Sequence, residues 1–385
     1  MARPVNSLCV ALLAAAIPAV LVAQSSVPER RLEKPDGEFP ESFDQIGALR
    51  ELPGGKVLVV DLGPKSLLLA DFKSGQQATI GRNGQGPGEY QFPGELIPYP
   101  GDSTLLVDRV SRRFLTVGPD GKLGKTVPFP DGLQGLAQPK GADRMGRIYF
   151  QASPFAGLGA GAAVSATAPD SVPVVRWDRA TNRLDTLTRV KIPATKMQVS
   201  GGANARMVMM RPQPYAAQDE WAAGPDGRLA VARVGDYHVE WLGDHPARGA
   251  PVNYDRVRVD DGDRDAYMEA MKNTRNRITV TSGGPGRGPA PTLPEPKAEE
   301  FDWPEYKPPF RSRSALMSSD GQLWLQRYTP SRDSTPAFDV FDASGKLASR
   351  VYLPKGRQVV GIGQGTIYAV RIDEDGLQWL ERYRR

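Results

Sequence analysis

Hydrophobic and polar positions along this chain repeat a short unit of strand-forming segments. A Gly-containing turn precedes an alternating apolar run, and this combination occurs six times. Gly permits the positive φ of a tight hairpin, and alternating strand-forming residues after the turn indicate a β-strand. The six segments are PGGKVLVVD (53–61), PGDSTLLVD (100–108), DRMGRIYFQ (143–151), GPDGRLAVA (224–232), SSDGQLWLQ (318–326) and GIGQGTIYAV (361–370).

Each segment is followed, after a polar gap, by another apolar run, and in most units by a second turn and a fourth strand-forming segment. Four antiparallel strands per unit, repeated radially, are typical of a β-propeller. A blade spans roughly 40–50 residues. The spacings between successive apolar runs are 48, 43, 81, 94 and 44 residues, counted from Val57, Leu105, Ile148, Leu229, Leu323 and Ile367. The sequence therefore predicts an all-β fold, a six-bladed β-propeller with four-stranded antiparallel blades.

The two long spacings require insertions, at about 193–214 and 260–310. The second insertion contains the one convincing helix pattern, 263–278, in which Tyr267 and Met271 recur at helical spacing. The Gly/Pro-rich tract that follows the helix suits neither strand nor helix. We expect the helix to cover one blade or the channel mouth, and the tract to form an exposed loop.

Residues 1–23 have the pattern of a signal peptide, because Arg3 precedes a nearly unbroken apolar stretch. The stretch is shorter than the ~20 residues of a spanning helix, so we expect cleavage near Ala23 and no stable membrane span afterwards. Cys9 is the only cysteine and lies in this segment, which leaves the mature chain without thiol chemistry or a disulfide. We predict a single exported domain, residues 24–385, that is periplasmic or extracellular and monomeric.

The last predicted unit lacks a fourth strand, because the chain ends within or just after its third strand-forming segment, 377–383. A propeller protects its sheet edges by closing the ring. We therefore expect an N-terminal strand within 27–32 to pair beside 377–383 and to close the last blade.

The composition agrees with a fold of short strands and turns and bears on the expected partners. The 41 Gly and 35 Pro favour turns and short strands. The formal charge is +5, but Lys and Arg occur singly, with no basic run of five or more. Dispersed charge of this kind is typical of a solvated surface, so nucleic acid is not an expected partner.

The segment 80–117 resembles the NHL repeat, and its loop GRNGQGPGEY (81–90) resembles that of exported six-bladed propeller proteins of bacteria. The resemblance implies the propeller fold and no particular activity. The other units match only in their hairpin rhythm. The matching residues are Gly81, Gly84, Gly86, Gly88 and Tyr90 in the loop, then Pro93, Leu96, Ile97, Gly101, Leu105 to Asp108, Arg112, Arg113 and Phe114.

The Gly-rich loop invites a phosphate-binding interpretation, since backbone N–H groups in such loops can hold anions. Phosphate loops lie between a strand and a helix, however, and strands are predicted on both sides here. We interpret the loop as a connection between blades, with Arg82 and Glu89 as a polar pair.

Ligands of propellers usually bind at the central channel and its mouth, which the first strand of each blade lines. The candidate ligand-binding residues there are Glu95, Asp219, Trp221, Arg311 and Arg313. We expect the acids to face the arginines, because an unpaired buried charge is costly. Glu95, Asp219 and Glu220 are also candidate ligands of a divalent cation such as Ca²⁺, which prefers carboxylate oxygens.

These features favour a non-catalytic binding module for a protein, peptide or glycan at the channel face. Catalytic residues and an organic cofactor are not assigned. One alternative is a divalent-metal-dependent lactone or ester hydrolase of propeller type, with Glu95 and Asp219 as metal ligands. A second alternative is a structural envelope protein whose partner binds the Gly/Pro-rich insertion.

Overall fold

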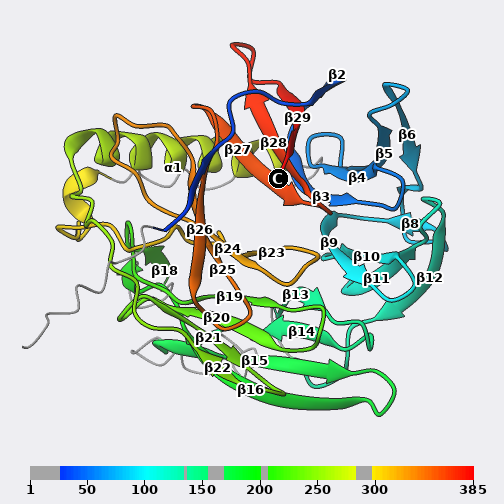
Figure 1. Ribbon diagram of the computed structural model, residues 1–385, viewed down its shortest axis with the longest axis horizontal. Helices are drawn as coiled ribbons and strands as arrows, with labels where there is room; N and C mark the ends of the chain where they lie inside the picture. The colour runs from blue at the N-terminus through cyan, green and yellow to red at the C-terminus, as the bar shows by residue number, and fades with distance from the viewer. Residues whose placement is uncertain (1–26, 134–136, 155–168, 201–206, 283–296) are drawn as a thin grey trace, which may run out of the picture.

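The computed structural model describes residues 27–133, 137–154, 169–200, 207–282 and 297–385. The chain forms a six-bladed β-propeller of four-stranded antiparallel sheets, which confirms the predicted fold class. In Figure 1 the blades form a ring, and the first strand of each blade contacts the first strands of its two neighbours. The predicted signal peptide, 1–23, lies outside the described residues.

Each of the first three blades consists of four strands that follow one another in the chain. Blade 1 contains β3 (Ile46–Glu51), β4 (Lys56–Asp61), β5 (Ser66–Asp71) and β6 (Gln76–Ile80). Blade 2 contains β9 (Pro93–Tyr99), β10 (Ser103–Asp108), β11 (Arg113–Val117) and β12 (Leu123–Pro128). Blade 3 contains β13 (Gln138–Ala142), β14 (Ile148–Gln151), β15 (Ser171–Asp178) and β16 (Arg183–Lys191).

The remaining blades follow the same order, and the last one combines both ends of the chain. Blade 4 contains β19 (Glu220–Ala223), β20 (Leu229–Arg233), β21 (His238–Leu242) and β22 (Ala247–Arg248). Blade 5 contains β23 (Leu316–Met317), β24 (Leu323–Gln326), β25 (Ala337–Phe341) and β26 (Leu347–Tyr352). Blade 6 contains β27 (Arg357–Ile362), β28 (Thr366–Ile372), β29 (Gln378–Arg384) and β2 (Gly37–Phe43).

An N-terminal strand closes the last blade, as predicted, but it lies later in the chain than expected. Strand β2 pairs antiparallel with β29. The expected segment, 27–32, instead contains β1 (Glu29–Arg31), which runs parallel to β26 at the outer edge of blade 5. Phe39 and Phe43 of β2 are 0% and 2% exposed, whereas β1 is exposed throughout. The closing strand is therefore the one with two large apolar side chains to bury.

The insertions add elements outside the blades. The region 193–214 contains a hairpin of β17 (Thr195–Ser200) and β18 (Met207–Pro212), and 260–310 contains the helix α1 (Asp261–Ser282) and a short 3₁₀ helix, η1 (Ala298–Glu300). The helix spans the predicted 263–278. Within the described ranges, no helix is both long and apolar enough to cross a membrane.

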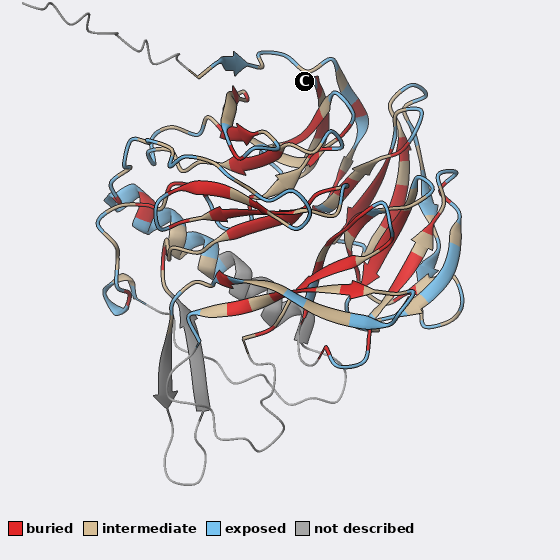
Figure 2. Ribbon diagram, turned by 60° about the horizontal axis from the view of Figure 1, so that its bottom comes forward, coloured by how far each residue is buried: buried red, intermediate tan, exposed pale blue. Residues whose placement is uncertain are grey.

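Hydrophobic clusters lie between neighbouring blades, and the described residues form six of them, one at each blade interface. Successive residues of a strand point to opposite faces. In β4, Val57 and Val59 face blade 6 while Leu58 and Val60 face blade 2. The second strands are covered on both faces and therefore read as unbroken apolar runs. Figure 2 shows this burial along the inner strands, with exposed residues on the outer ones.

The Gly-rich loop connects blades 1 and 2 through two short strands, β7 (Arg82–Asn83) and β8 (Glu89–Tyr90). Arg82 Nε lies 2.6 Å from Glu89 Oε1, so the expected pair is present. The N–H of Gly86 donates to Glu89 Oε2 at 2.8 Å, which together with Arg82 lowers the pKa of that carboxyl group. The Tyr90 hydroxyl accepts the N–H of Leu67 in blade 1 at 2.9 Å.

A carboxylate at the end of the second strand fixes the start of the first strand in blades 1 and 2. Asp61 accepts the backbone N–H groups of Asp44 and Gln45 at 3.1 and 2.9 Å. Asp108 accepts those of residues 91–92, both at 3.1 Å. This contact explains why the apolar run of the unit ends in Asp.

Replacing Phe39 by Ala is expected to lower the free energy of unfolding by about 3–5 kcal/mol, since a large side chain is removed from a closed core. Thermal and urea denaturation followed by circular dichroism measure the change. Arg30→Ala in the exposed strand β1 serves as the control and should change stability by about 0.5 kcal/mol or less. Equal effects of the two substitutions would contradict the closing role of β2.

Candidate functional site

The sequence-predicted site residues lie on three blades, at one face of the ring. This face, on which the first strands of the blades begin, is called the leading face below. The chain positions place them in or just before the first strands of blades 2, 4 and 5. They are Glu95 on β9, Asp219 directly before β19, Glu220 and Trp221 on β19, and Arg311 and Arg313 ahead of β23.

In the described part of the chain, Glu95 and Asp219 pair with arginines of their own blades and not with the expected arginines ahead of β23. Arg109 Nε donates to Glu95 Oε2 at 3.1 Å. Arg233 donates to Asp219 Oδ2 at 2.9 Å, and two backbone N–H groups also donate to this carboxylate. The side chain of Asp219 is only 8% exposed. Both carboxylates therefore fasten a first strand to its own blade.

Glu220 is the buried acid of the channel mouth, with 1% of its surface exposed. Its Oε1 accepts the backbone N–H of Arg313 at 2.6 Å and a side-chain N–H of Gln218. Its Oε2 has no hydrogen-bond partner among the described residues and lies 4.0 Å from Lys140 Nζ. A buried carboxylate oxygen normally has a hydrogen bond, so this atom has an unused acceptor capacity.

Lys140 brings a third blade into the site. Its Nζ lies 4.9 Å from the ring centre of Trp221, a cation–π arrangement, and its side chain is 27% exposed. Burial lowers the pKa of Lys140, Glu220 opposes that shift, and the nearby Arg313 adds to it. The ammonium group therefore favours an additional negative partner.

A β-bulge directs Lys140 to this position. The pairing of β13 with β14 shifts register between Pro139 and Gly141, which leaves Lys140 unpaired. Bulges re-aim side chains and often lie beside functional sites. The corresponding first strands of blades 1, 2 and 6 shift register in the same way. The hydrophobic pattern does not reveal a single extra residue, so the sequence did not point to Lys140.

Trp221, one of the candidate ligand-binding residues predicted from the sequence, is buried between two blades. Its surface is 0% exposed, and it belongs to the cluster between blades 3 and 4. Its indole N–H donates to Gln151 Oε1 at 2.9 Å. The residue is a structural tryptophan whose ring supports Lys140.

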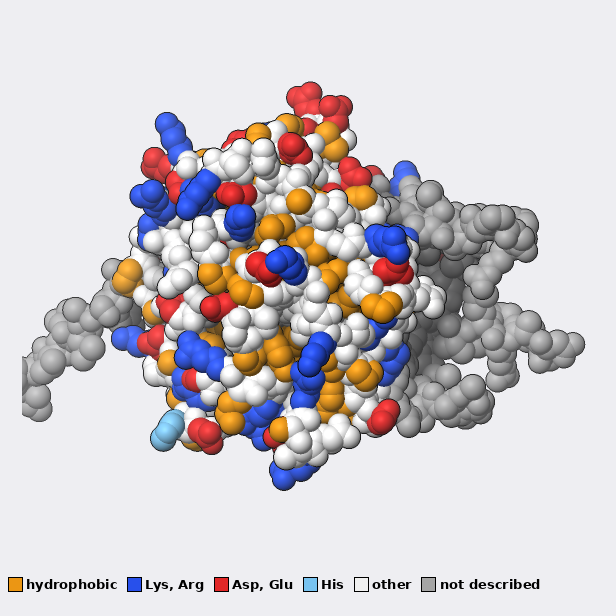
Figure 3. All heavy atoms as spheres, turned by 90° about the vertical axis from the view of Figure 1, so that its right-hand side faces the viewer, with side chains coloured by type: hydrophobic (Ala, Val, Ile, Leu, Met, Phe, Trp, Pro, Cys, Tyr) orange, Lys and Arg blue, Asp and Glu red, His pale blue; other side chains and the backbone are white. Residues whose placement is uncertain are grey.

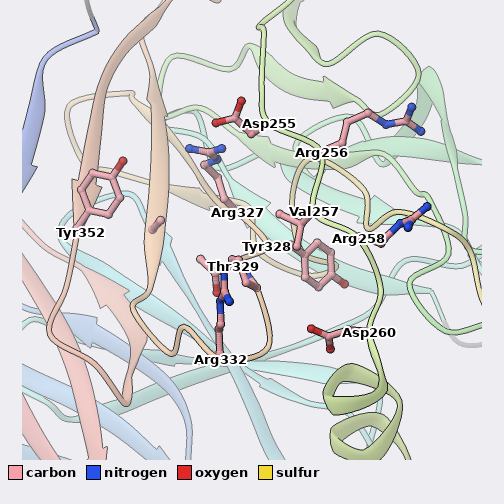
Figure 4. A pocket seen from close by; sticks show the side chains of 12 residues that line it. Asp255, Arg256, Val257, Arg258, Asp260, Arg327, Tyr328, Thr329, Arg332 and Tyr352 are labelled. Atoms are coloured by element: carbon pink, nitrogen blue, oxygen red, sulfur yellow. The ribbon is translucent and has the colours of Figure 1, made fainter.

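Two cavities lie beside the channel mouth and share the wall 327–330. The larger, of about 580 Å³, is shown in Figure 4. In this view the side chain of Arg332 extends towards Thr329. The side chains of Arg256 and Arg258 point away from Arg332 and Thr329. Arg258 is 2.5 Å from Glu305, outside the cavity. Arg258 is therefore paired outside the larger cavity.

The candidate metal ligands do not fit a divalent cation. The described residues contain no group of three or more His, Cys, Asp or Glu side chains that could hold a metal ion. Arginine side chains contact Glu95 and Asp219, and the free oxygen of Glu220 faces the ammonium group of Lys140. Ca²⁺ takes six to eight oxygen ligands, and a neighbouring cation repels it.

Comparisons with known proteins give distant structural similarities. No protein-family model and no curated protein matches the chain. Similar solved structures include a gluconolactonase from Xanthomonas campestris, with 12% identity, 90% of this chain and 91% of that chain covered and a TM-score of 0.42. They also include the calcium-binding protein regucalcin from Agrobacterium tumefaciens, with 10% identity, 93% of this chain and 97% of that chain covered and a TM-score of 0.41. Virginiamycin B lyase from Staphylococcus aureus has 8% identity, 90% of this chain and 97% of that chain covered and a TM-score of 0.39. At these identities and TM-scores, the similarities do not indicate an activity of this chain.

Glu220→Gln is expected to lower the pKa of Lys140 further, because the carboxylate that favours the ammonium form is removed. More of the amine is then uncharged at pH 8–9, and Lys140 should react faster with an amine-acylating reagent. Peptide mass spectrometry after timed labelling measures this rate.

Lys125, exposed on β12, is the internal control and should react at the same rate in both proteins. Equal labelling rates of Lys140 in the two proteins would show that Glu220 does not act on the ammonium group.

Proposed function

We propose that this chain is a non-catalytic binding module that takes an anionic part of a protein, peptide or glycan ligand at the channel mouth of the leading face. The supporting observation is that the cations at the channel mouth are incompletely paired with acids. Lys140 is its ion-pair partner, while Arg311 and Arg313 have no carboxylate within ion-pair distance among the described residues. The buried Glu220, with one free oxygen, thus lies beside Lys140, and Arg313 is close enough to act on the same ammonium group.

This arrangement suits a ligand that both accepts and donates hydrogen bonds. A carboxylate, sulfate or phosphate group accepts from the two arginines, and charge-assisted hydrogen bonds of this kind are the strong ones. A hydroxyl or amide N–H of the same ligand donates to the free oxygen of Glu220. Elsewhere the charges are mixed: the face in Figure 3 shows acidic and basic side chains next to one another.

Several related assignments belong to the same proposal. Export by residues 1–23 and the NHL-like character of the repeats fit a binding module that works outside the cytoplasm as a monomer. The hydrolase alternative gains no support from the geometry of the carboxylates. The alternative of a structural protein that binds its partner through the Gly/Pro-rich tract concerns residues that lie mostly outside the described ranges.

Arg313→Gln is expected to weaken binding of an anionic oligomer about tenfold, because a charged hydrogen bond contributes roughly 1.5 kcal/mol or more. The probes are fluorescent oligogalacturonate and oligoglutamate, measured by anisotropy, and the affinity should fall as salt is added. Preference for one oligomer separates a glycan from a peptide ligand.

Arg144→Gln is the matched control, since Arg144 is an exposed arginine at the turn between β13 and β14, away from the leading face. Neutral maltohexaose should not bind. Failure of both anionic oligomers to bind the native protein would refute the proposal. A rise of Tm on adding Ca²⁺ in the same preparation would instead support the hydrolase alternative.

A further inference from the structure

The smaller cavity of the leading face, of about 300 Å³, lies between the start of α1 and the loop that follows β24. Its wall includes Tyr215, Asp263, Lys307, Arg311 and Tyr328. The volume is at the lower end of the range for small-molecule sites. The cavity therefore has room for about one ring-sized group.

Among the cations of this wall, Arg311 alone lacks an acidic partner in the described part of the chain. Lys307 is buried and lies 2.6 Å from Asp263 Oδ1. Arg357 donates two hydrogen bonds to Glu381, at 2.9 and 2.8 Å, and Arg327 lies 3.8 Å from a buried aspartate. Arg311 is exposed and stands 5.5 Å from the ring centre of Tyr328. Its guanidinium group is available to an anion at the cavity.

Two tyrosine rings form the apolar part of the wall. The ring centres of Tyr215 and Tyr328 are 5.4 Å apart in an edge-to-face arrangement, and Tyr267 and Trp303 pack against Tyr215. The hydroxyl of Tyr215 donates to the backbone oxygen of Asp263 at 3.2 Å. Burial also raises the pKa of the Tyr215 hydroxyl, so the hydroxyl remains a donor at neutral pH.

The backbone of Tyr215 has an uncommon conformation. Its φ is +49°, a left-handed conformation that is strained for a bulky aromatic residue. Strained residues tend to lie at binding and catalytic sites, where the surroundings hold them.

Hydroxyl groups complete the cavity and leave acceptors free. Thr329 donates its hydroxyl proton to the backbone oxygen of Asp333 at 2.7 Å, and Ser331 donates to Asp260 at 2.8 Å. A hydroxyl oxygen that has donated its proton can still accept. The cavity thus offers one cation without an acidic partner, hydroxyl acceptors and two aromatic rings, over which the ammonium group of Lys307 also lies.

We propose that this cavity binds a uronic-acid residue, a sugar ring that carries one carboxylate. The carboxylate accepts from Arg311, the apolar face of the ring lies against Tyr215 and Tyr328, and the sugar hydroxyls donate to Thr329 and Ser331. A phosphate ion would use the arginine but neither ring. The assignment deepens the proposed function and rests on it in one respect, since Arg311 also belongs to the channel mouth.

Saturation-transfer NMR and calorimetry with methyl α-galacturonide test the assignment. Native protein should bind this probe at least tenfold more tightly than methyl α-galactoside, acetate or inorganic phosphate. Arg311→Met should weaken binding at least tenfold and Tyr328→Leu several-fold. Arg144→Met, a change of an exposed arginine away from the leading face, should have no effect, and the Tm of each variant checks its fold.

Absence of saturable galacturonide binding, or unchanged affinity in Arg311→Met, overturns the proposal. Equal affinity for phosphate or acetate also overturns it, because the site would then be a general anion site. Lys140→Met separates the cavity from the channel mouth: the variant should keep its affinity for the monosaccharide and lose affinity for the oligomers. Native protein that binds the monosaccharide but neither anionic oligomer would refute the proposed function and leave the cavity assignment standing.

Discussion

Closure of the ring by strand β2 is the constraint on which the candidate site depends. Blade 6 takes three strands from the end of the chain and its fourth from the beginning. Phe39 and Phe43 hold that strand in the cluster between blades 6 and 1. Glu220 and the backbone of Arg313 are 93 residues apart in sequence yet hydrogen-bonded. Such contacts across blades persist only while the closed ring holds the first strands together. The geometry of the candidate site therefore depends on the same closure that stabilises the fold.

The same packing explains why the ammonium group of Lys140 favours a negative partner. Hydrophobic clusters cover both faces of the strands and remove water from groups at their inner edge. Burial disfavours the charged form of a lysine and opposes its hydration, and this is the direction of the Lys140 pKa. Glu220 compensates only partly, because its nearer oxygen is 4.0 Å away. In the proposed function, an anionic ligand would supply the interaction that the fold leaves incomplete.

The fold could be predicted from the sequence because its signals are local. Gly turns and alternating apolar residues placed the strands, and each of the six predicted segments contains all or most of the second strand of a blade, namely β4, β10, β14, β20, β24 and β28. The closing segment was placed too early, since its identity depends on long-range burial of Phe39 and Phe43. The partners of Glu95 and Asp219 depend on register, and Lys140 depends on a bulge of one residue. Neither register nor a bulge changes the hydrophobic period, so the fold was easier to predict than the site.

Backbone strain connects the channel mouth with the neighbouring cavity. Tyr215 and Arg313 stand ahead of the first strands of blades 4 and 5 with φ values of +49° and +57°. Gly would adopt these conformations without the penalty of roughly 1–2 kcal/mol that other residues incur. At Arg313 the conformation accompanies the backbone N–H bond to Glu220, and at Tyr215 it places an aromatic ring in a cavity wall. Tyr215 and Arg313 are two of the eight described residues other than Gly with positive φ, and in both the conformation is tied to a contact of the candidate site.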